Sequence, residues 1–237
     1  MKSVFKNFIK NSRLIHDFSS FLVNLLPDYV EHNFSKYIEI KKCLLNLNYD
    51  QVEGDYCEFG CFTGAAINHA LKTHNKFSKK NKTKNYLNRN FFGFDSFEGF
   101  PEEVHNEYQS ENFISDYNFV KKLENKFDNC KIVKGYFNKT LTSEKFKTFN
   151  KIALAFIDCD IYSSSVPVFN FINTKLSNGA YVIIDDCFNL DLNGKSIYQS
   201  LTEHPHLHKN LIKITNYGLN GIVFKFLRKE INNEQTI

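Results

Sequence analysis

Two apolar runs that each end in aspartates constrain the fold of this chain more than any other feature. The runs and their acids are Ile152–Ile157 with Asp158 and Asp160, and Tyr181–Ile184 with Asp185 and Asp186. Uninterrupted apolar runs of this length are typical of buried parallel strands. The carboxyl ends of parallel strands meet at one edge of an open sheet, where ligands bind, so we expect the four acids to converge there. Because neighbouring carboxylates repel one another, this arrangement predicts a bound divalent cation.

The rest of the chain alternates between strand-like and helix-like segments. Between the two runs, apolar residues recur at helical spacing from Val166 to Leu176, and Asn178-Gly179 is expected to end that helix. Further strands are expected at 56–59, 91–94 and 131–134, and further helices at 65–74, 119–127, 142–149 and 194–201. A turn at 217–221 separates two short apolar segments and predicts a closing antiparallel hairpin. This alternation predicts a doubly wound α/β sheet.

Residues 1–50 are predicted to form helices ahead of a sheet domain at 51–237. Leu14, Ile15, Phe18, Phe21, Leu22 and Leu25 share one helical face, and a second helix is expected over about residues 34–47. This apolar face must be covered by the sheet domain or by another subunit. Three interpretations stay open: a cap packed on the sheet, a lid over the active site, or a dimer interface. An amphipathic membrane anchor is disfavoured because acidic residues accompany the basic ones.

Composition narrows the class of protein. A chain of 237 residues suits one domain with an appended cap, and a net charge of +4 is too small to indicate a nucleic acid or membrane partner. No stretch approaches the roughly 20 apolar residues of a membrane helix, and no apolar signal segment follows the basic N-terminus. The six cysteines form no CxxC pair, which indicates reduced, buried thiols. We therefore expect a cytoplasmic protein.

A turn that contains two glycines follows the strand expected at 56–59. It runs from Glu58 through Gly60 to Gly64 and differs from the dinucleotide fingerprint GxGxxG. Without a side chain at Gly60 the backbone can lie against a ligand, and Glu58 offers a carboxylate to an amine. Asp95, at the end of the next strand, can accept both hydroxyls of a ribose. Together these residues fit S-adenosylmethionine, and an ordinary strand–helix turn with a capping aspartate is the structural alternative.

Five sequence blocks occur in order between about Gly54 and Leu201. They are Gly54–Gly60, Phe94–Pro101, Gly135–Leu141, Ile157–Tyr162 and Leu176–Asp186. In this order they resemble the macrocin-type O-methyltransferases (the TylF-like family), S-adenosylmethionine-dependent enzymes that act largely on sugar hydroxyls. The resemblance implies a Rossmann-like class I methyltransferase sheet and a small-molecule acceptor of the sugar or nucleotide-sugar type. It also favours a homo-oligomer.

The resemblance implies roles for individual residues. Cofactor binding is assigned to Glu58, Gly60, Gly64, Asp95, Ser96, Gly135, Tyr136 and Phe137, with the last three bordering the adenine. By the same resemblance, Asp158, Asp185 and Asp186 hold Mg²⁺. Asp158 and Asp160 are the catalytic candidates. Asp160 is expected to take the acceptor proton, or alternatively to support Asp158 as a ligand.

The chain departs from the family pattern at three positions. Ala65 replaces a glycine, Ser163 replaces a glutamate near the site, and Cys187 replaces an aromatic residue. The last two changes affect the acceptor side and bring retention of the metal into question. Two other functions stay open: a glycosyltransferase, because Asp158-x-Asp160 also fits a motif that binds a metal–nucleotide-sugar, and a methyltransferase-like binding module without turnover, because Ser163 replaces the glutamate.

Three histidines alternate along the chain near the C-terminal end. His204, His206 and His208 match no common zinc spacing. Pro205 predicts that they lie in a surface loop.

Overall fold

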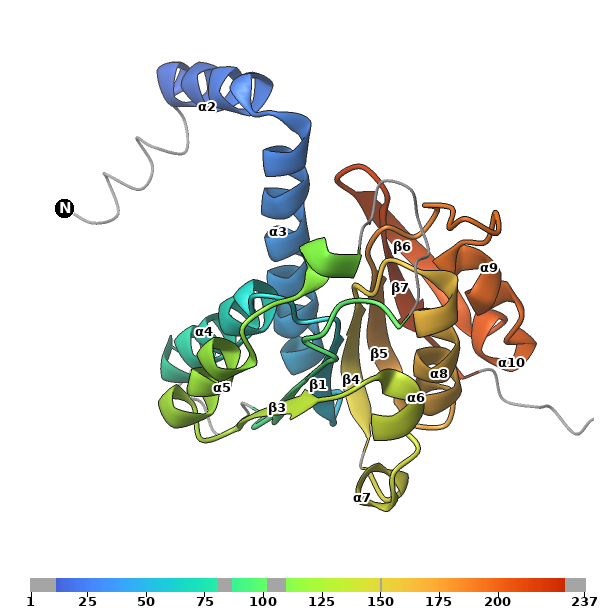
Figure 1. Ribbon diagram of the computed structural model, residues 1–237. Helices are drawn as coiled ribbons and strands as arrows, with labels where there is room; N and C mark the ends of the chain where they lie inside the picture. The colour runs from blue at the N-terminus through green and yellow to red at the C-terminus, as the bar shows by residue number, and fades with distance from the viewer. Residues whose placement is uncertain (1–11, 81–86, 102–109, 150, 229–237) are drawn as a thin grey trace, which may run out of the picture.

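The computed structural model of the chain describes residues 12–80, 87–101, 110–149 and 151–228. At its centre is a seven-stranded sheet in the order β3-β2-β1-β4-β5-β7-β6 (Figure 1). The strands are β1 (Asp55–Phe59), β2 (Phe91–Asp95), β3 (Cys130–Lys134), β4 (Ile152–Ile157), β5 (Leu176–Ile184), β6 (Leu211–Tyr217) and β7 (Gly221–Phe226). β1 to β5 pair in parallel, and β7 and β6 complete the sheet in antiparallel fashion. The predicted doubly wound sheet with a closing hairpin is confirmed.

Helices cover both faces of the sheet. The helices of the described residues are α2 (Arg13–Leu25), α3 (Asp28–Tyr49), α4 (Ala65–Lys80), α5 (Tyr117–Lys126), α6 (Phe137–Thr140), α7 (Glu144–Lys147), α8 (Tyr162–Ile172), α9 (Ile197–Thr202) and α10 (Pro205–His208), with a 3₁₀ turn, η1, at Ser110–Phe113. α3, α4 and α5 pack on one face, and α8, α9 and α10 pack on the other (Figure 1). Successive strand residues alternate between the two layers: Tyr56 joins the core beneath α3 and α4, whereas Cys57 joins the core beneath α8.

The strand order reverses at β1, because β2 lies on one side of it and β4, a later strand, lies on the other. β1 and β4 end level with each other, with Phe59 paired to Ile157. In doubly wound sheets, ligands bind beyond the carboxyl ends of the strands at such a reversal. The fold therefore places the glycine turn after β1 and the aspartates after β4 side by side.

The segment between the two acidic strand ends differs from the sequence prediction. α8 ends at Ile172 and β5 begins at Leu176, so Asn178-Gly179 lies inside a strand. The strand accommodates this pair because its register against β4 shifts there and Gly179 takes a φ of +88°. The expectation that Asn178-Gly179 ends a helix is therefore wrong.

The predicted loop around Pro205 is also wrong. Pro205 is the first residue of the short helix α10, where its missing N–H would have no helical partner in any case. His204 and His206 contact the side-chain oxygens of Asn170 and Asn173 at 3.1 and 3.3 Å. Both histidines thus pair with surface amides at the end of α8.

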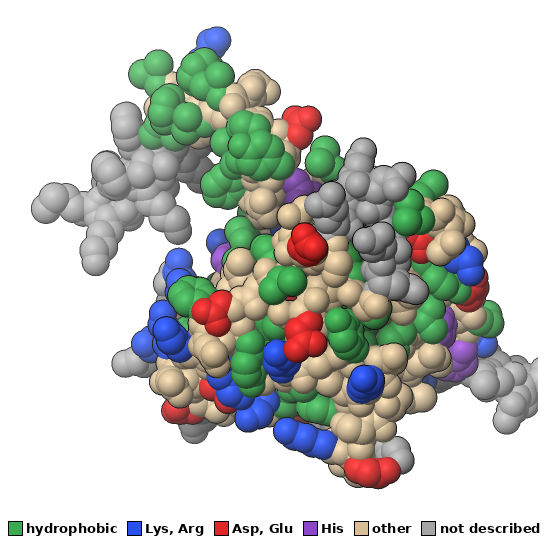
Figure 2. Space-filling model, viewed as in Figure 1, with side chains coloured by type: hydrophobic (Ala, Val, Ile, Leu, Met, Phe, Trp, Pro, Cys, Tyr) green, Lys and Arg blue, Asp and Glu red, His purple; other side chains and the backbone are tan. Residues whose placement is uncertain are grey.

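The two N-terminal helices meet the domain in different ways. α3 buries Ile40, Cys43, Leu44 and Leu47 from its second half, and it is longer at both ends than the sequence predicted. α2 contains no buried residue and extends away from the domain (Figures 1 and 2). Leu14, Phe18, Phe21, Leu22 and Leu25 of α2 are all exposed. The predicted apolar face exists, and the described part of this one chain leaves it uncovered.

Gly60 provides a test of how closely β1 and β4 approach. Its φ is +96°, and a Cβ there would lie 1.7 Å from the carbonyl oxygen of Asp158. Gly194 also has a positive φ, +70°, but a Cβ there would meet none of the described atoms within 4 Å. We expect Gly194→Ala to lower the melting temperature by about 2–4 °C, because left-handed strain costs about 1 kcal/mol. Gly60→Ala should lower it by more than about 10 °C, because the backbone must also move.

Thermal unfolding followed by circular dichroism measures both shifts. Equal shifts in the two variants would show that Gly60 is needed only for its φ.

Candidate active site

A cavity of about 810 Å³ opens beyond the carboxyl ends of β1, β2 and β4. The predicted site residues that line it are Glu58, Gly60, Asp95, Ser96, Tyr136, Phe137, Asp158 and Asp160. Gly64, Gly135, Asp185 and Asp186 do not line it, and the two glycines each have a positive φ in a turn beside it. Asn33, Lys36 and Tyr37 of α3 also contribute to its wall. The N-terminal helix is therefore part of the site.

Glu58 brings a buried carboxylate to the cavity. Tyr56 Oη donates to its Oε2 at 2.5 Å, whereas Oε1 has no hydrogen-bond partner among the described residues. Burial raises the pKa of Glu58 to about 8; the hydrogen bond from Tyr56 lowers it, and the charge of Asp158 raises it further. A buried, unsatisfied carboxylate oxygen is costly unless a ligand pairs with it. This end of the cavity therefore fits the ammonium group of S-adenosylmethionine.

Asp95 reaches the same cavity but is already engaged. Its Oδ2 accepts from the backbone N–H groups of Cys61 and Phe62 at 2.7 and 2.8 Å. Its Oδ1 accepts from Phe97 N–H at 2.7 Å. Phe62 and Phe97 both have positive φ, so the carboxylate holds two strained turns in place. The turn-capping role is thus present in the structure. Hydrogen bonding to a ribose stays a prediction, with Oδ1 the oxygen that has capacity to spare.

Three carboxylates converge at the other end of the cavity. Asp158, Asp160 and Asp186 each offer an oxygen, and these oxygens all lie within 4.8 Å of one another. Burial raises the pKa of Asp158 to about 7, and the nearby charge of Asp185 adds to this effect. Burial and neighbouring aspartates also raise the pKa values of Asp160 and Asp186. Hard oxygen donors that repel one another fit Mg²⁺ or Ca²⁺.

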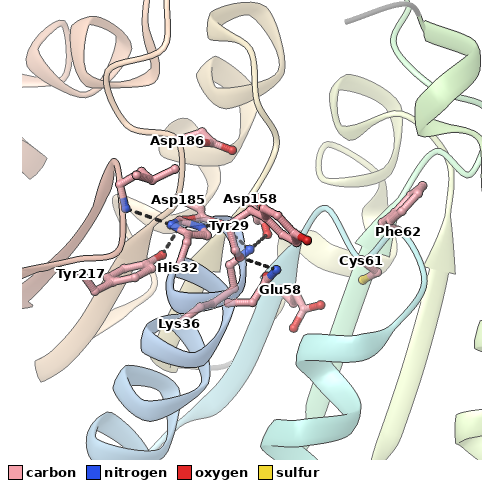
Figure 3. A network of polar contacts seen from close by, with 12 residues as sticks. Tyr29, His32, Lys36, Glu58, Cys61, Phe62, Asp158, Asp185, Asp186 and Tyr217 are labelled. Carbon is pink, nitrogen blue, oxygen red and sulfur yellow. Dashed lines mark hydrogen bonds and ion pairs between the residues drawn. The ribbon is translucent and has the colours of Figure 1, made fainter. Parts of the chain in front are cut away.

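Asp185 is not one of these three acids, and it is held by residues of α3 and of the hairpin (Figure 3). Its Oδ1 accepts from Tyr217 Oη at 2.9 Å and lies 3.1 Å from His32 Nε2, and its Oδ2 pairs with the ammonium of Lys36. Burial alone would raise the pKa of Asp185, but the hydrogen bond from His32 and the charge of Lys36 lower it below its usual value. Asp185 thus anchors α3 and the hairpin, and its predicted role as a metal ligand stays a prediction.

Sequence reasoning missed His32 and Lys36 as members of the site. They lie one turn apart on α3, and each is largely buried, with 12% of its side chain exposed. The backbone N–H of Leu219 donates to His32 Nδ1 at 3.1 Å, which leaves Nε2 to donate to Asp185. The available signal was weak: two basic residues at i, i+4 spacing on a helix otherwise assigned only as a cap.

The sheet, the cavity at its reversal point and the carboxylate of Glu58 near the end of β1 are those of a Rossmann-like class I methyltransferase. The chain belongs to the macrocin O-methyltransferase (TylF) family, whose model matches residues 35–221. It is therefore an S-adenosylmethionine-dependent O-methyltransferase, as the five sequence blocks predicted.

Several solved structures share this fold. The O-methyltransferase NovP shares 20% identity over 82% of this chain and 80% of its own, with a TM-score of 0.64. The calicheamicin methyltransferase CalS11 shares 21% identity over 94% of this chain and 90% of its own, with a TM-score of 0.62. An O-methyltransferase from Bacillus cereus, solved in complex with SAH, shares 11% identity over 81% of each chain, with a TM-score of 0.53. No curated protein matches the chain.

Two further expectations from the sequence concern the cysteines and membrane-spanning helices. All six cysteines are free and buried, as expected of reduced thiols. Among the described residues, no helix combines the length and apolar character needed to cross a membrane.

Glu58→Gln tests whether the enzyme keeps a destabilising charge for its cofactor. In the unfolded chain a glutamate titrates near its ordinary pKa of about 4.3, but folding raises the Glu58 pKa to about 8. Between these values the folded protein binds a proton that the unfolded chain does not, so the free energy of unfolding falls as pH rises. The glutamine of Glu58→Gln has no proton to lose in this pH range, so the variant does not show this fall in the free energy of unfolding. The melting temperature of Glu58→Gln minus that of wild type should therefore be higher at pH 8.5 than at pH 5. The variant should also bind S-adenosylhomocysteine at least about tenfold more weakly.

Thermal unfolding without ligand and calorimetric titration measure the two effects. Glu111→Gln changes an exposed carboxylate outside the cavity and serves as the control. A Glu58→Gln melting temperature with the same pH dependence as wild type would contradict the assignment.

Proposed function

We propose that this enzyme transfers the methyl group of S-adenosylmethionine to a hydroxyl of a sugar or sugar-containing small molecule, with Mg²⁺ at the acceptor end. The observation that carries the proposal is the division of one cavity between two kinds of carboxylate. Glu58 presents an unsatisfied oxygen at one end, and Asp158 and Asp160 converge with Asp186 beside the other. A TDP-rhamnose 3'-O-methyltransferase, CalS11, has the same fold, which supports a sugar acceptor.

The proposed reaction is a direct displacement within this cavity. The acceptor oxygen forms a bond to the methyl carbon, the bond from carbon to sulfur breaks, and S-adenosylhomocysteine leaves. The enzyme's main task is to align oxygen, carbon and sulfur, for which a rigid cavity is suited. The acceptor proton passes to Asp160 in this scheme, because its carboxylate lines the cavity beside Asp158, at the acceptor end. Asp158 and Asp186 would hold the metal, and a bound divalent cation would lower the pKa of the hydroxyl.

The two alternative functions now differ in their support. The glycosyltransferase interpretation used only Asp158-x-Asp160 and leaves Glu58 unexplained, and the chain belongs to a methyltransferase family. A binding module without turnover is still a testable alternative, because Ser163 lines the cavity where the family pattern has a glutamate. Methyl transfer to any sugar acceptor would exclude it.

The metal requirement is tested by separating turnover from cofactor binding. EDTA should reduce methyl transfer by at least about 100-fold, because the acceptor hydroxyl keeps its high pKa without a bound cation. S-adenosylhomocysteine affinity should stay within about threefold, since Glu58 and Asp95 do not depend on the ion. Mg²⁺ should restore the rate. Radiolabelled methyl transfer and calorimetry measure the two quantities, and equal rates with and without EDTA would remove the metal from the proposal.

We propose a cytoplasmic location, which the six free cysteines support.

We also propose that the protein forms a homo-oligomer. The support for assembly is the apolar face of α2, on which Leu14, Phe18 and Phe21 are each more than half exposed. Apolar surface of this kind favours contact with a partner. A second copy of the chain is the proposed partner.

The prediction for assembly uses two substitutions on that face. Phe18→Glu combined with Phe21→Glu should turn an oligomer into a monomer in multi-angle light scattering at micromolar concentration. The domain should melt within about 3 °C of wild type, because α2 buries nothing against it. Ser19→Glu combined with Asn24→Glu adds the same charge to α2 and should leave the oligomer intact. A monomeric wild type would contradict the proposal.

A further inference from the structure

Tyr56 places a hydroxyl group at a core position of strand β1. Its side chain is fully buried, and its ring packs against Phe91 of the neighbouring strand, with 5.2 Å between the ring centroids. Packing at such a position needs only an apolar side chain, and a hydroxyl there is costly unless it forms a hydrogen bond. Among the described residues, the partner of the Tyr56 hydroxyl is the carboxylate of Glu58, which lines the cavity. The hydroxyl is thus explained by the candidate active site rather than by packing.

The geometry of the strand directs this contact. Tyr56 and Glu58 are two residues apart on β1, so their side chains leave the same face of the sheet. Cys57, between them, belongs to the core on the opposite face. Tyr56 Oη donates to Glu58 Oε2 at 2.5 Å, although Tyr56 is not among the residues that line the cavity. The tyrosine therefore reaches along the strand toward the cavity and supports Glu58 from within the core.

This hydrogen bond engages one oxygen of the carboxylate and leaves the other available. Oε1 has no hydrogen-bond partner among the described residues. The terminal torsion of a glutamate is broad and roughly two-fold, so a carboxylate without a fixed donor can turn. A donor held at Oε2 limits this rotation and keeps Oε1 in one place. A carboxylate accepts several hydrogen bonds at once, so Tyr56 does not compete with a second donor at Oε1.

The hydroxyl also acts on the charge of Glu58. Burial raises the pKa of Glu58, and the hydrogen bond from Tyr56 is the largest of the effects that lower it. A ligand ammonium group pairs with the charged form of the carboxylate. Without the hydroxyl, the carboxylate would be both less well oriented and more easily protonated.

We propose, on the basis of the proposed function and its cofactor site, that Tyr56 is a positioning residue that orients the Glu58 carboxylate so that Oε1 receives the ammonium group of S-adenosylmethionine. Tyr56 acts on the cofactor through Glu58, because it does not itself line the cavity. Its effect is selective. The hydroxyl supports binding of the amino-acid end of the cofactor and leaves binding of the adenosine end unchanged.

The test compares two ligands by calorimetric titration into the full-length protein. S-adenosylhomocysteine has the amino-acid end, whereas methylthioadenosine lacks it. Tyr56→Phe removes only the hydroxyl and should weaken S-adenosylhomocysteine binding at least about fivefold, while methylthioadenosine binding stays within about twofold of wild type. Tyr181→Phe removes the hydroxyl of another buried tyrosine, outside the cavity, and should change neither affinity. Equal weakening of both ligands by Tyr56→Phe, or of neither, would overturn the proposal.

A second comparison decides the question even if Tyr56→Phe does not fold. Tyr56→Phe combined with Glu58→Gln replaces both partners, which avoids leaving a buried carboxylate without its donor. The combined variant should bind S-adenosylhomocysteine within about twofold of Glu58→Gln alone, because a neutral amide binds the ammonium group weakly in any orientation. A further loss of about fivefold or more would overturn the proposal, because Tyr56 would then act by a route other than Glu58.

Failure of this proposal can be distinguished from failure of the proposed function. If the cofactor site is wrongly assigned, Glu58→Gln will bind S-adenosylhomocysteine as tightly as wild type does. If only the role of Tyr56 is wrong, Glu58→Gln will bind it more weakly, and Tyr56→Phe will not discriminate between the two ligands.

Discussion

The active site depends on how like charges are compensated where two parallel strands end. The topology brings Asp158, Asp160, Asp185 and Asp186 to one poorly hydrated edge of the sheet, where their mutual repulsion is large. The protein offsets part of that repulsion with Lys36 and with hydrogen bonds from His32 and Tyr217. These groups come from α3 and from the hairpin, so the same compensation fixes the N-terminal helix and the last strands against the centre of the fold. Anchoring and chemistry thus share one set of carboxylates.

Glu58 and Asp185 show how partners, rather than burial, decide the state of an acid. Both carboxylates are almost fully buried, yet their pKa values move in opposite directions. Asp185 has a cation and two hydrogen-bond donors, so its charged form is stabilised. Glu58 has no cation paired with it and one oxygen without a partner among the described residues, so burial destabilises its charged form until a ligand arrives. An unsatisfied buried acid is what distinguishes a binding group from a structural one.

The parts that sequence predicted correctly are those encoded locally. Apolar runs predict strands, and the acids and glycines near their ends mark the sheet edge, so the positions of Glu58, Gly60, Asp95 and Asp158 beside the cavity were predictable from the sequence. The contact between Lys36 and Asp158 joins residues 122 positions apart, and no periodicity reveals which turn of a helix will face which strand end. The same reason explains Asn178-Gly179, a local turn signal that pairing with β4 overrides. Hydrogen bonding to a neighbouring strand can thus override the local turn propensity of a sequence.

Gly60 connects the two halves of the cavity in a way that its motif alone does not reveal. The glycine was expected to let a ligand approach the backbone, and it does line the cavity. Yet the atom nearest to its missing Cβ is the carbonyl oxygen of Asp158, so the glycine also lets the ends of β1 and β4 touch. That contact sets the spacing between the carboxylate proposed for the cofactor and the acids proposed for the acceptor. A displacement reaction is sensitive to this spacing at the level of an ångström, and rigid backbone packing fixes it better than mobile side chains would.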